Sequence, residues 1–425
     1  MKSKVGPLSV QEPLEQRLDG IKEYFVDVPT ERVSSDVIEM TKQYFSPIKG
    51  LRLRSRPRVI EKMRLSTNSG SPFFTKRKNV VSRNTSQYDE CAILGWRGQE
   101  GGIEWDDVKQ RAVFMMPFDL NIRELQFYQP FIEAVQKKHL IPAYISMDYV
   151  DQVTTRLFDT KGPDDYVVTT DFTKFDQSFN PSLQEVAREV INYLIVPQDR
   201  GWIESVFPVK YNIPLLCSED LMLVGAHGMG SGSGGTNADE SIAHKALQLG
   251  VAAEKGEKLN PNSMAYGDDG VLTYPGIKVD EVMAFYQKFG LKMNPDKQMV
   301  SKTETIILRR WYNTNYRKGG QMKGVYSTFR ALGRLLGQER YYDPRKWGPE
   351  LVTLRAWSII ENCNNHPLID EFIEFVIKGD KYKLGLLIPG FFDRLDRVVR
   401  DAEAISSDFL GYTKGQLQKK EGIQE

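Results

Sequence analysis

Two short apolar runs meet at a pair of adjacent carboxylates between residues 263 and 274 of the chain. Residues 263–266 and 271–274 have strand character, and Asp268 and Asp269 lie between Gly267 and Gly270. Glycine allows the backbone angles of a tight turn, and Asp-Gly between apolar runs is typical of a β-hairpin. The pattern predicts a hairpin with two acids at its tip, where like charges repel and a divalent cation would be stabilising. Taken alone, such a pentapeptide is more often an ordinary surface turn.

A second acidic turn follows a predicted strand further upstream. Residues 166–170 have high strand propensity and end at Asp171, and Asn180-Pro181 then predicts the start of a helix. If this strand lies beside the hairpin, Asp171 and Asp268 converge. Two such carboxylates could hold two Mg²⁺ ions, which activate a 3′-hydroxyl and stabilise the leaving pyrophosphate. The alternative is that two unrelated aspartates cap the ends of two strands.

A glycine-rich segment over residues 225–236 lies between a short apolar run and a predicted helix. Gly230, Gly232 and Gly235 fit the spacing of a dinucleotide-binding fingerprint, so a nicotinamide-dependent dehydrogenase is an alternative function. Against it, the preceding strand is short and no acid stands at a suitable distance. The absence of a Gly-Lys-Ser/Thr sequence excludes a Walker loop.

Composition limits the class of protein. A chain of 425 residues with 40% hydrophobic content can bury a large core and form two or three lobes. Its 57 basic and 56 acidic residues nearly cancel, so affinity for nucleic acid requires local segregation of charge, as in residues 50–83 with ten basic residues and one acid. The three cysteines show no CxxC spacing, which argues against disulfides or zinc. With no signal-like N-terminus and no run of eighteen apolar residues, we expect a soluble protein without a membrane segment.

Periodicity and turn residues predict the remaining elements. Helices are expected over 34–45, 120–139 and 279–289, and throughout the region beyond residue 330. Extended segments are expected over 109–117, 143–146 and 305–312, with a glycine turn at 318–320. The pattern divides the chain into a mixed region to about 165, a strand-and-helix core to about 328 and a helical C-terminal lobe.

Three ordered motifs resemble motifs A, B and C of viral RNA-dependent RNA polymerases. They are Asp171-x-x-x-x-Asp176, Ser231-Gly232-x-x-x-Thr236 and Tyr266-Gly267-Asp268-Asp269. Three further segments resemble motifs F, D and E of the same family, namely Lys109-x-Arg111, Pro295-Asp296-Lys297 and Leu308-Arg309-Arg310. The residues around Asp171 and Thr236 are similar to those of picobirnaviruses, which have double-stranded RNA genomes.

The resemblance implies an α+β, right-hand polymerase fold with fingers, a palm built on an antiparallel sheet, and a helical thumb. It implies an N-terminal region and fingers at 1–165, a palm at 166–328 with a fingers insertion at about 197–228, and a thumb at 329–425. The implied activity is template-directed synthesis of RNA that replicates and transcribes a viral genome by two-metal nucleotidyl transfer. RNA template and product and ribonucleoside triphosphates are the implied partners, a viral capsid protein is a further candidate, and the virion interior and host cytoplasm are the implied locations.

The resemblance also implies catalytic and metal-binding roles. Asp171 and Asp268 would be the principal ligands of two Mg²⁺ or Mn²⁺ ions, and Asp269 would assist them. Lys297 would donate a proton to pyrophosphate.

The other motif residues would bind nucleotide or RNA. Lys109 and Arg111 would neutralise the incoming triphosphate, and Asp176 with Thr236 would sense the ribose 2′-hydroxyl. A loop formed by Ser231 and Gly232 would shift as the template advances. The residues implied to hold the primer end are Leu308, Arg309 and Arg310.

One position departs from the family pattern. Many relatives have Asn four residues after the motif B threonine, where this chain has Glu240. Asn237, which we include as a nucleotide-binding candidate, or Asp239 could take the missing role, or Glu240 could simply favour the start of a helix.

Two further functions compete with RNA synthesis. Reverse transcriptases share the Tyr-x-Asp-Asp turn, but they usually have a bulky aromatic residue where this chain has Asp176. A catalytically silent RNA-binding module would need only the basic segment 50–83.

Overall fold

The acidic hairpin belongs to an antiparallel sheet whose strand order is β6-β7-β3-β8. The structure is a computed structural model that describes residues 12–83, 91–99, 109–294, 298–337, 345 and 347–405. The strands of this sheet are β3 (Val167–Thr170), β6 (Met264–Tyr266), β7 (Asp269–Leu272) and β8 (Val300–Ser301). The hairpin and the strand before Asp171 are therefore confirmed. All four residues of β3 are buried, which fits their β-branched composition.

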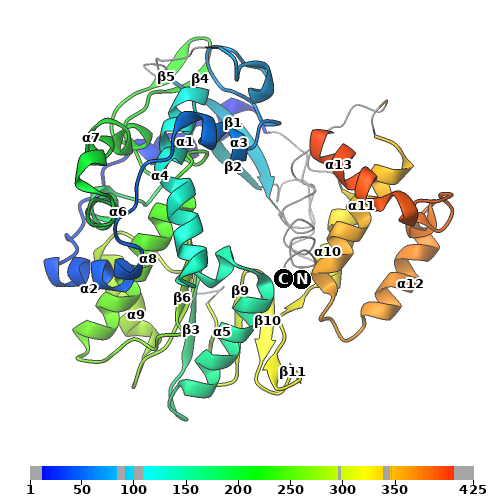
Figure 1. The fold of residues 1–425 in the computed structure, drawn as a ribbon. Helices are drawn as coiled ribbons and strands as arrows, with labels where there is room; N and C mark the ends of the chain where they lie inside the picture. The colour runs from blue at the N-terminus through cyan, green and yellow to red at the C-terminus, as the bar shows by residue number, and fades with distance from the viewer. Residues whose placement is uncertain are drawn as a thin grey trace.

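Helices cover one side of this sheet and are packed against one another (Figure 1). The helix α8 contacts β6, and it also contacts α2, α6 and α9. Asn180 caps α6 through its side-chain oxygen, which accepts from the backbone N–H groups of Ser182 and Leu183, as the Asn-Pro pair predicts. These helices are α2 (Ser35–Phe45), α6 (Pro181–Leu194), α8 (Thr236–Glu254) and α9 (Val279–Lys288).

A second sheet lies at the top of Figure 1 and has the strand order β2-β1-β4-β5. Its strands are β1 (Ala92–Gln99), β2 (Lys109–Met115), β4 (Leu215–Ser218) and β5 (Leu221–Leu223). Because β1 pairs in parallel with β4, residues of the 197–228 segment join a sheet begun by much earlier residues. The boundaries expected for fingers, palm and thumb stay predictions.

The N-terminal half also supplies several helices. The long α4 (Phe118–Lys137) follows β2 and contains Pro130. It confirms the helix predicted at 120–139. The others are α1 (Leu14–Lys22), α3 (Arg56–Lys62), α5 (Met147–Thr160) and α7 (Gly201–Ser205).

Two of the predicted extended segments are wrong. Residues Pro142–Tyr144 form a 3-10 turn that leads into α5, whose start is capped by the Ser146 side chain. The segment 305–312 is a hairpin of β9 (Glu304–Ile307) and β10 (Arg310–Asn313), not one strand. Its turn residues Leu308 and Arg309 have φ of 51° and 61°, which non-glycine residues rarely adopt, so the sequence carries no turn signal there.

Short strands connect this hairpin to the C-terminal helices. β13 (Val325–Tyr326) pairs with β10, and β11 (Arg317–Lys318) pairs with β12 (Gln321–Met322) around the predicted glycine turn. The helices that follow, on the right of Figure 1, are α10 (Thr328–Leu336), α11 (Pro349–Ile360), α12 (Ile369–Gly379) and α13 (Leu395–Ile405). The helical C-terminal region is thus confirmed.

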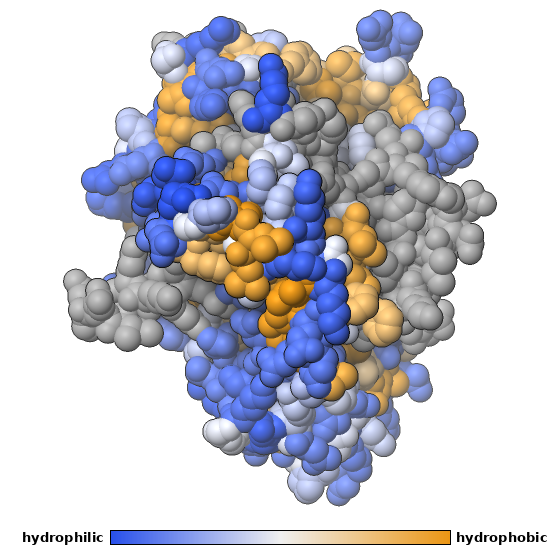
Figure 2. Space-filling model, turned by 90° about the vertical axis from the view of Figure 1, so that its right-hand side faces the viewer, coloured by the Kyte–Doolittle hydropathy of each residue, from blue (hydrophilic) through white to orange (hydrophobic). Residues whose placement is uncertain are grey.

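The C-terminal helices bury their shared faces in two small apolar clusters. They also leave apolar side chains exposed, and Figure 2, which views this side, shows hydrophobic surface among hydrophilic residues. The exposed side chains on these helices and the loops between them include Phe329, Leu336, Phe375, Leu386, Leu387 and Phe392. None of the described helices combines the length and the hydrophobicity of a membrane span.

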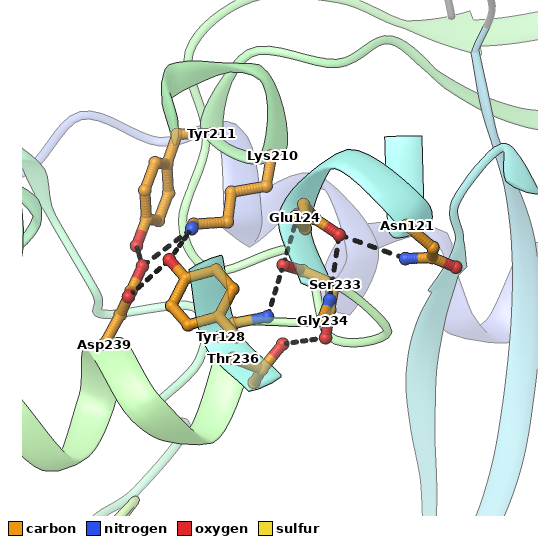
Figure 3. A network of polar contacts seen from close by, with 10 residues as sticks. Asn121, Glu124, Tyr128, Lys210, Tyr211, Ser233, Gly234, Thr236 and Asp239 are labelled. Atoms are coloured by element: carbon orange, nitrogen blue, oxygen red, sulfur yellow. Dashed lines mark hydrogen bonds and ion pairs between the residues drawn. The ribbon is translucent and has the colours of Figure 1, made fainter. Parts of the chain in front are cut away.

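A buried polar network fixes the start of α8 (Figure 3). Asp239 and Lys210 are fully buried and form an ion pair of 2.8 Å between Nζ and Oδ2. The hydroxyl groups of Tyr128 and Tyr211 donate to the two oxygens of Asp239 at 2.7 and 2.6 Å. Because charges are costly to bury without partners, this complete set of donors is what allows Asp239 to lie inside the protein.

A second buried acid holds the loop before α8. Glu124, on α4, accepts from the Ser233 hydroxyl at 2.6 Å and from the backbone N–H of Gly234 at 2.8 Å (Figure 3). The side chain of Asn121 donates to the same carboxylate at 3.0 Å. The glycine-rich loop is therefore attached to α4 by side-chain bonds rather than by a strand ladder.

We expect Lys210→Met to lower the free energy of unfolding by about 3–5 kcal/mol, because it leaves the buried carboxylate of Asp239 without its cation. Denaturant unfolding of the purified chain measures this change. Lys258→Met, which makes the same substitution at an exposed site, should change the free energy of unfolding by less than about 0.5 kcal/mol. Equal effects of the two substitutions would show that the ion pair contributes nothing specific.

Candidate active site

The register of the central sheet brings the three predicted catalytic aspartates to one place. Thr170, the last residue of β3, pairs with Gly270, which directly follows Asp269. Asp171, the next residue after β3, therefore lies beside the tip of the hairpin, which carries Asp268 and Asp269. On the other side of Asp171, its carbonyl oxygen accepts from the backbone N–H of Asn294 at 2.8 Å. The expectation that the two strands are neighbours is confirmed.

The carboxylates of this cluster repel one another. Burial, and then the charge of Asp268, raises the pKa of Asp269 to about 7, and Asp171 adds to the effect. Burial also raises the pKa of Asp268; Arg111 opposes this shift, whereas Asp176 and Asp171 contribute to it. A site that holds this much negative charge at a strand edge favours a cation.

The carboxylates fit a divalent ion whose remaining ligands come from the substrate and water. Among the described residues, no group of three or more His, Cys, Asp or Glu side chains forms a ready-made metal site. Mg²⁺ in phosphoryl-transfer sites is usually held by one or two carboxylates together with substrate phosphates and water, so a closed protein cage is not required. The carboxylates of Asp171 and Asp268 have the chemistry for this arrangement.

A buried histidine fastens the strand to the hairpin. The ring of His244, on α8, lies between the Gly267 carbonyl, 2.9 Å from Nδ1, and the Thr170 hydroxyl, 3.2 Å from Nε2. Burial lowers the pKa of His244 to about 4, so the ring is neutral and can donate through Nδ1 and accept through Nε2. A Cβ at Gly270 would lie 2.4 Å from the His244 ring, so only glycine fits there.

Arg111 faces the acidic cluster from β2. Its side chain is exposed to solvent. The protein around the guanidinium removes part of its hydration, which by itself would lower the pKa of Arg111. The charges of Asp176 and Asp268 outweigh this effect and raise the pKa of Arg111 above its usual value. Lys109 begins the same strand, but its side chain lies outside the described structure, and Lys297 lies outside the described residues altogether.

Asp176 is buried beside the glycine-rich loop. The Ser231 hydroxyl donates to its carboxylate, and the Met229 N–H donates to its backbone carbonyl at 2.8 Å. On the other side, the Ser231 carbonyl accepts from the Phe114 N–H of β2 at 2.7 Å. The loop is thus clamped between the turn after Asp171 and the strand that carries Arg111.

The other motif B residues make contacts that differ from the expected ones. The Thr236 hydroxyl donates to the Ser233 carbonyl at 3.3 Å, and no described contact joins it to Asp176. The side chain of Asn237 accepts from the Tyr144 hydroxyl at 2.8 Å.

The arginines of the turn between β9 and β10, which contains Leu308, Arg309 and Arg310, have different neighbours. The charge of Arg309 opposes the rise in the pKa of Asp269, so Arg309 lies close to the acidic turn. Arg310 instead acts on Glu361 and Cys363, which belong to the C-terminal helical region. The turn therefore lies between the aspartate cluster and the C-terminal helices.

Three of the ten basic residues in the segment 50–83 pair with acids on α4. Arg54 and Lys62 pair with Glu133, and Arg56 pairs with the buried Asp119. The remaining cations include Arg64 and Arg77, which with Lys62 line a cavity of about 340 Å³ beside the loop. The other lining residues are Met63, Asn121, Leu125, Gln129 and 232–234.

A family model described as viral RNA-dependent RNA polymerase matches residues 103–361, more than half of the chain. The chain belongs to the viral RNA-dependent RNA polymerases. It is therefore an RNA-directed RNA polymerase, a nucleotidyltransferase. The dehydrogenase and reverse transcriptase alternatives are wrong.

The polymerase is similar to proteins of human picobirnavirus. A curated relative from strain Human/Thailand/Hy005102/-, described as a potential RNA-dependent RNA polymerase, is 51% identical over 434 residues, which span 97% of this chain and 81% of the relative. A crystal structure of a human picobirnavirus RNA-dependent RNA polymerase matches with a TM-score of 0.91 and 47% identity over 99% of this chain and 86% of that one. The insertion-loop deletion mutant matches with a TM-score of 0.91 and 50% identity over 94% and 83%. The right-hand fold and the picobirnavirus resemblance are confirmed.

Three supporting residues of the polymerase site, His244, Ser241 and Glu124, escaped the sequence analysis. His244 follows Thr236 and Glu240 at a spacing of four residues and so shares their face of α8, which is a signal that the sequence contains. Ser241, next to this face, accepts from the Gly267 N–H at 2.8 Å. Glu124 offers no such signal, because only the folded chain brings it to the loop.

We expect Gly232→Ala to destabilise the polymerase more than Gly225→Ala does, by about 2 kcal/mol. Both glycines have similar positive φ, +125° and +118°, so both substitutions strain the backbone. A Cβ at Gly232 would lie 2.2 Å from the Phe114 carbonyl oxygen, whereas a Cβ at Gly225 meets nothing within 4 Å. Urea unfolding measures both variants, and equal losses would contradict the clamped geometry of the loop.

The stability of the metal-free polymerase should fall as pH rises from about 4 to 7, because folded Asp269, with a pKa of about 7, holds a proton that the unfolded carboxyl releases near pH 4. Asp269→Asn removes this loss. In EDTA, we expect it to gain about 1–3 kcal/mol relative to the unmodified chain between pH 5 and pH 8. Asp220→Asn, in an exposed turn, should show no such gain; a pH-independent effect of Asp269→Asn would argue against repulsion in the cluster.

Proposed function

We propose that this polymerase replicates and transcribes a viral RNA genome by two-metal nucleotidyl transfer. The observation that carries the proposal is the pairing of Thr170 with Gly270, which brings Asp171 beside Asp268 and Asp269. The raised pKa of Asp269 supports it, because a protein gains from such crowding of acids only where a cation relieves it.

The carboxylates of Asp171 and Asp268 would hold two Mg²⁺ or Mn²⁺ ions, with Asp269 assisting. When bound, the ions supply activation of the primer 3′-hydroxyl and charge stabilisation at the leaving pyrophosphate. The protein's own part is to fix the donors: His244 and Ser241 hold the hairpin turn, so the carboxylates need no reorganisation when substrate arrives.

The remaining residues would bind and orient the substrates. Arg111 faces the acids on the side of β2 and would pair with the triphosphate that accompanies the ions. Asp176, held by the Ser231 hydroxyl, would accept a hydrogen bond from the ribose. Arg309, near Asp269, would contact the primer end.

RNA template and product would lie along the basic surfaces next to this site. The cavity beside the glycine-rich loop, lined by Lys62, Arg64 and Arg77, is a suitable place for backbone phosphates, which give affinity without sequence reading. A viral capsid protein remains a proposed partner, and the virion interior and host cytoplasm remain the proposed locations.

The direct experiment is extension of a primed RNA template by the full chain with Mg²⁺ and ribonucleoside triphosphates. We expect Asp268→Asn, which removes one charge without changing the volume, to lower synthesis by about a hundredfold or more. RNA binding should persist in that variant, and Asp220→Asn should keep full synthesis. Full activity of Asp268→Asn would refute the metal-site assignment, and RNA binding without metal-dependent extension by the unmodified chain would favour the silent RNA-binding module.

A further inference from the structure

A buried carboxyl group on α5 is hydrogen-bonded to the strand that follows the turn at Leu308 and Arg309. Asp151 is fully buried, and its Oδ1 accepts from the Tyr312 hydroxyl at 2.8 Å and from the backbone N–H of Gly324 at 3.3 Å. Tyr312 belongs to β10, and Gly324 lies between β12 and β13. One carboxylate therefore joins α5 to two segments that lie 161 and 173 residues further along the chain.

The second oxygen of this carboxylate is incompletely satisfied. Oδ2 of Asp151 accepts no hydrogen bond from any donor among the described residues, and the Nζ of Lys323 is 3.6 Å away. Burial raises the pKa of Asp151, and the Tyr312 hydroxyl and then Lys323 oppose the rise. Otherwise α5 and β10 meet in a cluster of buried apolar side chains that includes Val153, Leu157 and Tyr312. Because a buried ion pair can often be replaced by apolar side chains without loss of stability, stability alone does not explain an acid at this position.

The turn between β9 and β10 is strained and must be held by its surroundings. Leu308 and Arg309 have φ of 51° and 61°, and non-glycine residues keep such angles only where neighbouring contacts impose them. Leu308 packs against the same apolar cluster, and the Thr305 hydroxyl of β9 lies 2.6 Å from the Thr169 hydroxyl of β3. These contacts fasten β9 to the central sheet, whereas Asp151 fastens β10 to α5.

The fit around Tyr312 leaves little freedom. A Cβ at Gly324 would lie 2.5 Å from the Tyr312 ring and from its hydroxyl oxygen, so only glycine allows this approach. Burial and then the charge of Asp151 raise the pKa of Tyr312, and Arg310 opposes the rise, as it does for Asp151. Arg310, which directly follows the turn, therefore lies near the same carboxylate, and a shift of Tyr312 would move the turn as well.

We propose that Asp151 is a positioning residue for the primer end: through the Tyr312 hydroxyl it fixes β10, and β10 fixes the turn that presents Arg309 to the aspartate cluster. The proposal rests on the proposed function, in which Arg309 contacts the primer. A turn that is already fixed needs no ordering when RNA binds, and a loose turn would lose this ordering entropy from the binding free energy. The contribution of Asp151 is therefore to binding of the primed RNA rather than to the chemical step.

The test measures kcat and KM for a primed RNA in single-nucleotide extension with ATP in excess. Asp151→Asn keeps an acceptor oxygen for Tyr312 and Gly324, so we expect its KM to stay within about twofold of that of the unmodified chain. Asp151→Leu and Tyr312→Phe each remove the hydrogen bond between the two side chains. We expect each to raise the KM for primed RNA about tenfold with little change in kcat, as loss of uniform binding does.

A double-mutant cycle with Arg309 separates positioning from folding. In an Arg309→Gln background the primer contact is already lost, so Asp151→Leu should raise the KM for primed RNA by less than about twofold further. Asp220→Leu, the same substitution in an exposed turn, should leave both constants unchanged. Thermal unfolding of every variant reports stability, and Tyr312→Phe takes the place of Asp151→Leu in the cycle if the latter does not fold.

The proposal is overturned if Asp151→Leu and Tyr312→Phe leave the KM for primed RNA unchanged, or if they raise it equally with and without Arg309. It is also overturned if Asp151→Asn raises this KM as much as Asp151→Leu does, because the acceptor for Tyr312 is then not what matters. Failure of the proposed function is distinguishable from these outcomes, since it would appear as absence of metal-dependent extension by the unmodified chain.

Discussion

The pairing of β3 with β7 is the constraint on which the site depends. Side chains of a strand alternate between faces, so a slip of one residue in this register would turn Asp171 away from Asp268. The backbone hydrogen bonds between the strands are not the only contacts that hold this register. Gly270 leaves room for the His244 ring, which is hydrogen-bonded to Thr170 at the end of β3 and to Gly267 in the hairpin turn. The repulsion among the acids is therefore opposed by a rigid backbone before any cation binds.

The helix α8 transmits this rigidity to the rest of the site. Its N-terminal turns carry Glu240, Ser241 and His244, and its start is fixed by the buried Asp239 with its three donors. A buried ion pair contributes little net stability, but it specifies one arrangement, because every alternative position leaves a charge without a partner. In this protein that specificity places Ser241 and His244, which hold the hairpin turn through Gly267.

The sequence predicted local features well and long-range partners poorly. The acidic hairpin, the Asn-Pro helix start and the strand ending at Asp171 each follow from neighbouring residues, so their prediction needed no tertiary information. Glu124 accepts a hydrogen bond from Gly234, which is 110 residues away in sequence, and no pattern in the sequence near either residue predicts this contact. The turn at Leu308 and Arg309 was missed for another reason, since both residues adopt positive φ without glycine, and the surrounding hairpin imposes that strain.

The glycine-rich segment shows how one spacing can serve two physical purposes. In a dinucleotide fold, such glycines let the backbone approach a pyrophosphate. In this chain, a Cβ at Gly232 would meet the Phe114 carbonyl and a Cβ at Gly228 would meet the Asp176 carbonyl, both within 2.5 Å. The glycines are required because protein backbones pass on both sides of the loop. The same close packing holds Ser231 against Asp176, so the loop's lack of side chains, which predicted ligand binding by its own backbone, instead positions a neighbouring carboxylate.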